Sequence, residues 1–148
     1  MAKYVLIVNF QPGVADDTPM EEWKPEEVTA HLDYYRALHQ ALVASGELVD
    51  TTILTPPDAA RIVRADAAGG RVVTDGPFQE FKEWVAGFQV VDVETEERAL
   101  EIAALVSAVP GPGGVPLQQP IHVRRVMDDG PSDVDSMNEW LQDAGGAH

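Results

Sequence analysis

Two spacings of apolar residues run along the chain, and each predicts one kind of element. Short β-branched and aliphatic runs predict strands, whereas apolar residues three and four positions apart predict helices. Two of the predicted strands flank a Gly-containing loop, which favours a β-hairpin. The predicted strands cover residues 3–9, 47–54, 60–65, 71–74, 87–93 and 121–127, with one helical turn over 79–84.

Two long helices are predicted. The first begins at Pro25, whose missing N–H costs nothing at the first helical position, and Ser45-Gly46 ends it. The second begins after Thr95, a helix-capping residue, and ends before Pro110. The first helix has an apolar seam that also contains His31 and His39; its other predicted members are Val28, Leu32, Tyr35, Leu38 and Leu42.

The order of these elements predicts the fold class. Strand, helix, strands with a hairpin, strand, helix and strand is the split β-α-β order of a ferredoxin-like α+β sheet with an inserted β-hairpin. The helices of such a sheet cover one face only. The other face would expose a large apolar patch in a single chain. We therefore expect a homodimer formed through the sheet faces.

The length predicts one folded domain and a tail. A chain of 148 residues fits one domain of ordinary size. We place this domain at residues 1–128 and an acidic tail at 129–148. Within the tail, Val134, Met137, Trp140 and Leu141 keep helical spacing, so we expect a short helix that docks on the domain.

Charge and composition exclude several function classes. The chain has 10 Lys and Arg against 25 Asp and Glu, a net charge of −15, which disfavours binding to nucleic acid or to anionic membranes. No apolar run is long enough to span a membrane, and we expect a cytoplasmic protein. The absence of Cys excludes disulfides and thiolate metal sites. His31 and His39 are too far apart to share a metal, and we expect neither metal nor cofactor.

One segment resembles a known family. Asp75-Gly76-Pro77-Phe78, preceded by Arg71–Thr74 and followed by Gly87-Phe88, resembles the DGPF branch of the YCII-related family, and the resemblance extends over about residues 3–128. It implies a dimeric α/β barrel and a cleft with a His and Asp pair. One class of relatives is linked to dehydrochlorination of a chlorinated hydroxyquinol. Family members are also often encoded beside extracytoplasmic-function sigma factors, or fused to them.

His31 and Asp75 are the candidate catalytic residues. An imidazole on a core-facing helix seam is partly desolvated and needs a partner for its N–H. A carboxylate, either Asp75 or the loop residues Asp16 and Asp17, would fix the tautomer and leave the other nitrogen as a general base. The alternatives are structural: His31 is a hydrogen-bonded core histidine, and Asp75 closes a turn before Gly76.

Two functions remain open at this point. The first is a small-molecule enzyme, a lyase or an isomerase, in which Asp75 orients His31 as acid or base. The second is a non-catalytic binding or regulatory module whose sheet edge or acidic tail contacts a protein partner, with a sigma factor suggested by the family association. Fold alone does not decide between them.

Overall fold

The computed structural model describes residues 1–10, 20–75, 84–127 and 130–145, which form an α+β fold with an antiparallel sheet and three α-helices. The strands are β1 (Ala2–Phe10), β2 (Leu48–Ile53), β3 (Arg61–Ala65), β4 (Arg71–Asp75), β5 (Trp84–Val93) and β6 (Ile121–Arg125). The helices are α1 (Pro25–Ala44), α2 (Glu96–Ser107) and α3 (Val134–Gly145), with 3-10 turns η1 (Met20–Glu22), η2 (Pro57–Ala59) and η3 (Pro112–Gly114).

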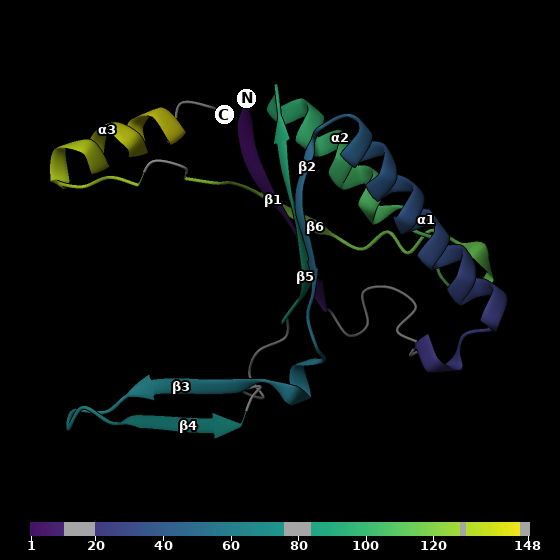
Figure 1. The fold of residues 1–148 in the computed structure, drawn as a ribbon, viewed down its shortest axis with the longest axis horizontal. Helices are drawn as coiled ribbons and strands as arrows, with labels where there is room; N and C mark the ends of the chain where they lie inside the picture. The colour runs from purple at the N-terminus through teal and green to yellow at the C-terminus, as the bar shows by residue number, and fades with distance from the viewer. Residues whose placement is uncertain (11–19, 76–83, 128–129, 146–148) are drawn as a thin grey trace.

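Four strands form the main sheet in the order β2-β5-β1-β6, and each neighbouring pair is antiparallel. Strands β3 and β4 pair with each other as the predicted hairpin, and with no other strand in the described part of the chain. In Figure 1, α1 and α2 cover one face of the main sheet, while the hairpin and α3 project from its other side, at opposite ends of the strands.

The core lies between the main sheet and the two covering helices. Alternation along the strands points Leu6 of β1 and Val91 of β5 into this core, where they meet Leu42 of α1 and Ile102 of α2. All four side chains are buried. Burial of this apolar area is the main favourable term in folding.

The helix ends agree with the predicted signals. Pro25 occupies the first turn of α1, which ends at Ser45 with Gly46 at φ +78°, a conformation that favours glycine. The Thr95 side chain accepts a hydrogen bond from the Arg98 N–H and caps α2. In the predicted helical turn at 79–84, residues 79–83 lie outside the described part of the chain, and Trp84 begins β5 instead.

Two predictions about burial are wrong. Leu32, predicted on the seam of α1, is half exposed, whereas the neighbouring seam residue His31 is buried as predicted. The tail forms the predicted helix, but Val134 and Leu141 of α3 do not dock on the described part of the chain, since they are 74% and 53% exposed. An amphipathic pattern indicates that a helix needs an apolar partner but not where the partner lies.

The face of the sheet away from α1 and α2 is only half buried. It presents Val5 and Ile7 of β1 opposite Val90 and Phe88 of β5, and all four side chains keep partial exposure. On β6, which pairs with β1, His122 and Arg124 alternate with the core-packed Val123 and are exposed. This face, called the open face below, has apolar residues at its centre and polar residues along its β6 edge.

Replacing Leu6 by Ala should destabilise the fold by about 2–5 kcal/mol, because a cavity opens between sheet and helices. Urea unfolding at fixed chain concentration measures this loss. Leu100→Ala, on the exposed side of α2, is the matched control and should change stability by less than about 0.5 kcal/mol. Equal losses for the two variants would contradict the assigned core.

Candidate functional site

The first two turns of α1 are fastened to the loop that follows α2. Glu27 and His31 are four residues apart and therefore share one face of α1. Glu27 accepts a hydrogen bond from the Gly113 N–H, and the His31 ring is hydrogen-bonded to the Pro110 carbonyl. Gly113 and Gly114 both have positive φ, at +69° and +73°, so the turn that meets α1 uses a conformation that favours glycine.

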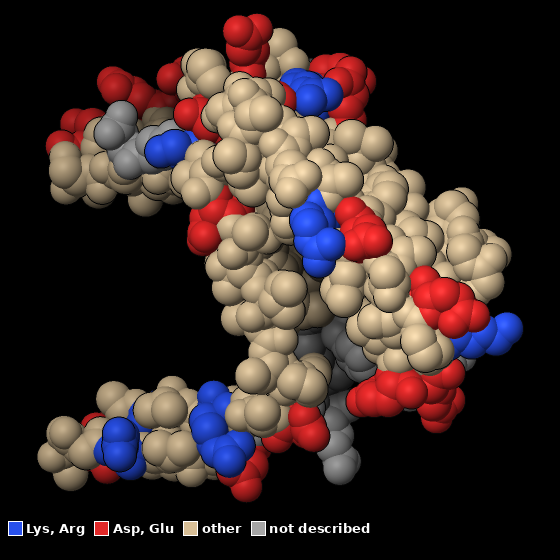
Figure 2. All heavy atoms as spheres, turned by 45° about the vertical axis from the view of Figure 1, so that its right-hand side comes forward, with Lys and Arg blue, Asp and Glu red and all other residues tan. Residues whose placement is uncertain are grey.

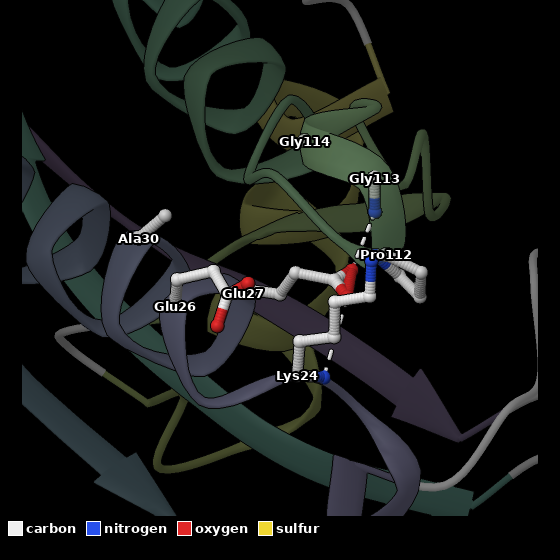
Figure 3. A pocket seen from close by; sticks show the side chains of 7 residues that line it. All are labelled: Lys24, Glu26, Glu27, Ala30, Pro112, Gly113 and Gly114. Atoms are coloured by element: carbon white, nitrogen blue, oxygen red, sulfur yellow. Dashed lines mark hydrogen bonds between the residues drawn. The ribbon is translucent and has the colours of Figure 1, made fainter.

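Glu27 uses both carboxylate oxygens. One oxygen accepts the backbone N–H of Lys24, just before α1, and the other accepts that of Gly113. Figure 3 shows the carboxylate between Lys24 and Gly113. These bonds form one wall of an open groove of about 530 Å³, lined by Lys24, Glu26, Glu27, Ala30, Pro112, Gly113 and Gly114.

His31 has a defined tautomer. Its Nδ1 lies 2.8 Å from the Pro110 carbonyl oxygen, which can only accept, so Nδ1 carries the proton. The neutral ring therefore has its lone pair on Nε2. His31 is buried, with 8% of its surface exposed, and its Nδ1–H is hydrogen-bonded to the backbone carbonyl of Pro110.

Aromatic rings surround His31. Trp23 and Tyr35 meet the imidazole edge to face, with centroid distances of 5.3 and 5.1 Å. Tyr35 in turn stacks on His39 at 5.9 Å, so residues 31, 35 and 39 form a row of rings one turn apart along α1. Burial raises the pKa of Tyr35 to about 12, which keeps its hydroxyl protonated at neutral pH.

The far end of this row reaches a polar residue in the core. The Gln89 amide nitrogen on β5 is 3.2 Å from Nε2 of His39, and Gln89 is buried. No described residue donates to the Gln89 amide oxygen. Partial burial lowers the pKa of His39, because water no longer stabilises the charged ring fully.

Asp75 lies at the end of β4 in the hairpin, and its side chain is 86% exposed. Its carboxylate pairs with Arg61 across the hairpin at 3.3 Å. Between His31 and Asp75, the described contacts include neither a hydrogen bond nor an ion pair. The acceptor of the His31 proton is thus a backbone carbonyl rather than the predicted carboxylate; Asp16 and Asp17 lie outside the described residues.

Sequence reasoning missed Glu27, Pro110 and Gln89. Pro110 acts through its carbonyl, and a backbone acceptor has no side-chain signature. Glu27 did carry a signal, since a carboxylate in the first turn often accepts backbone N–H groups.

Over the described ranges, no group of three or more His, Cys, Asp and Glu side chains is placed to hold a metal ion. No helix in those ranges is both long and apolar enough to cross a membrane.

The tautomer of His31 can be checked directly. A long-range ¹H–¹⁵N NMR spectrum of the neutral rings should show the proton of His31 on Nδ1, because Pro110 accepts it. The His31→Gln variant identifies the signal, and the exposed ring of His122 is the comparison. A His31 signal with the proton on Nε2 would contradict the site described above.

The depressed pKa of His39 predicts a pH dependence of stability. Because the unfolded chain binds this proton more readily than the folded chain, the free energy of unfolding should fall as the pH drops below about 6.5. It should stop falling once the pH is below the folded-state pKa. Urea unfolding of the wild type and of His39→Gln, followed from pH 8 to 5, isolates this effect: the variant should lose less stability, and parallel curves would refute it.

Comparison with known proteins agrees with the resemblance seen in the residues. The model of the YCII-related domain matches residues 2–111. An uncharacterised protein of Rhizobium meliloti (strain 1021) is 33% identical over 99 residues, which cover 66% of this chain and 79% of that protein. The matched residues include α1 with His31, the hairpin with Asp75, and α2. The chain therefore belongs to the YCII-related domain family.

Proposed function

We propose that this protein is a small-molecule enzyme, a lyase or an isomerase, in which His31 is the acid/base residue. The hydrogen bond from His31 Nδ1 to the Pro110 carbonyl carries the proposal. This hydrogen bond orients the ring and leaves the lone pair of the neutral ring on Nε2, where it would accept a proton from the substrate. When Nε2 takes a proton, the imidazolium still donates Nδ1–H to the carbonyl, and a hydrogen bond from a charged donor is stronger.

The groove at the start of α1 is the proposed entry for the substrate, although His31 itself is not among the residues that line it. Its volume of about 530 Å³ is within the ordinary range for small-molecule pockets. Ala30 lines the groove and directly precedes His31, and Pro112 follows the acceptor Pro110 by two residues. Lys24 and Glu26 supply a cation and an anion at the wall, which suits a polar substrate better than an apolar one.

Asp75 is proposed as the second member of the pair. Since Pro110 already accepts the Nδ1 proton, Asp75 would have to act at Nε2 or on the substrate rather than as the group that orients the ring. Its full exposure on the hairpin leaves the carboxylate accessible to a substrate or to another chain.

We also infer the finer fold and assembly. The order β2-β5-β1-β6, with α1 after β1 and α2 after β5, supports a ferredoxin-like split β-α-β arrangement. The half-buried open face supports a homodimer that closes two sheets into a barrel. The Asp75-Gly76-Pro77-Phe78 motif supports membership of the DGPF branch, although only Asp75 of the four lies in the described residues.

The alternative is a binding or regulatory module without catalysis. The exposed apolar residues of α3 favour it, because they are open to contact by another protein. A sigma factor is the partner that the family association suggests. In this alternative the His31 ring is a structural anchor for the loop after α2.

His31→Gln should separate catalysis from structure. A Gln amide can still donate to the Pro110 carbonyl, so the fold should persist, but it has no basic nitrogen. We expect a loss of about 10²–10⁴ in kcat. The assay uses a panel of small compounds. NMR detects deuterium exchange in carbonyl compounds that have an acidic C–H, and chloride release is followed for a chlorinated hydroxyquinol. Asp75→Asn should lower turnover too, and Gln40→Ala on exposed α1 is the control.

Full activity of His31→Gln on a compound that the wild type turns over would overturn the proposal. Absence of turnover across the panel, together with capture of a protein that depends on residues 129–148, would favour the binding module instead. Circular dichroism of each variant confirms that lost activity does not reflect lost fold.

A further inference from the structure

Two arms of the molecule expose apolar side chains that have no packing partner among the described residues. The first is the hairpin β3–β4, whose Val63 and Val73 are paired in register on one face and are 58% and 47% exposed. The second is α3, whose Val134, Met137 and Leu141 form one exposed stripe at helical spacing. An isolated two-stranded hairpin is marginal in water, so it gains stability from a packing partner.

The two arms carry opposite charge. The hairpin has Arg61, Arg64 and Arg71 against two Asp, and within the described part of the chain neither Arg64 nor Arg71 forms an ion pair. Helix α3 has Asp135, Glu139 and Asp143 and no Lys or Arg. Figure 2 shows blue side chains on the hairpin and red ones over α3, in a protein with a net charge of −15.

The arms project from the same face of the sheet. Figure 1 shows both beyond the open face, the hairpin at one end of the strands and α3 at the other. The open face between them holds Val5, Ile7, Phe88 and Val90. A partner on this face would therefore meet an apolar floor with a basic arm at one end and an acidic arm at the other.

A second copy of the chain can occupy this face in two symmetric ways. In one, a two-fold axis along the strands places hairpin against hairpin and α3 against α3, which brings like charges together. In the other, an axis across the strands places the hairpin of each copy against α3 of the other. Only the second arrangement places the basic hairpin against the acidic α3, and it also packs the Val63/Val73 pair of the hairpin on the apolar stripe of α3.

We propose that two copies clasp crosswise, with the Val63/Val73 face of each hairpin packed on the Val134/Met137/Leu141 stripe of α3 in its partner. This inference rests on the proposed homodimer and specifies how its halves are aligned. It also gives the tail a role: α3 lies beyond the residues matched by the family model and contributes a contact of its own. The exposed Asp75 at the base of the hairpin would then lie at the boundary between the chains.

Engineered cysteines test the alignment, because the chain has no Cys of its own. Val73→Cys in one preparation and Leu141→Cys in an isotope-labelled second one are mixed, allowed to exchange partners and oxidised. The crosswise clasp predicts a disulfide between labelled and unlabelled chains, read by mass spectrometry, and little linkage within either variant alone. Like-with-like pairing predicts the reverse. Cysteine at exposed Ala104, on the helix-covered side, is the control.

Charge reversal supplies the second test. Arg71→Glu should raise the Kd for self-association about threefold to fivefold, and adding Glu139→Arg in the same chain should restore it. Light scattering with size separation measures the association. A dimer that persists without mixed disulfides overturns the clasp but leaves the homodimer standing, whereas single chains at every concentration overturn both. Capture of a different protein by α3 from such single chains would assign this helix to the binding module.

Discussion

Among the described elements, helices cover one face of the sheet and leave the other open, and most other features of the molecule depend on this. The covered face holds the core that joins Leu6 and Val91 to Leu42 and Ile102. The uncovered face leaves Val5, Ile7, Phe88 and Val90 half exposed, with two projecting arms beside them. Stability within the chain thus comes from one side of the four-stranded layer, and the proposed association between chains would use the other side.

The candidate site lies on the covered side, where α1 meets the loop after α2. Two bonds from side chains one turn apart hold this junction, one from Glu27 and one from His31. The imidazole thereby has a structural role at Nδ1, and the lone pair of the neutral ring is on Nε2. The proposed catalytic role of His31 does not exclude its structural role, so a substitution that keeps the hydrogen-bond donor is needed to separate the two.

Much of the fold was predictable because the relevant signals are local. Pro25 and Thr95 mark helix starts through backbone chemistry, and the alternation of Gln89, Val91 and Val93 marks the buried side of a strand. The exposure of Leu32 was not predictable, since apolar spacing alone places Leu32 on the seam together with His31. His31 is buried because Pro110, far along the chain, satisfies its N–H. Contacts of this kind, like the partner of α3, depend on tertiary position rather than on local pattern.

The shared use of Glu27 has a consequence for how the groove can change. One carboxylate serves both the start of α1 and the turn at Gly113, so the two walls cannot be altered independently. A shorter or neutral side chain at position 27 would release the helix start and the turn at Gly113 together, and would reshape the groove without changing the His31 side chain. A change at this single carboxylate would therefore alter the shape of the groove while the proposed proton-transfer group, His31, stays the same.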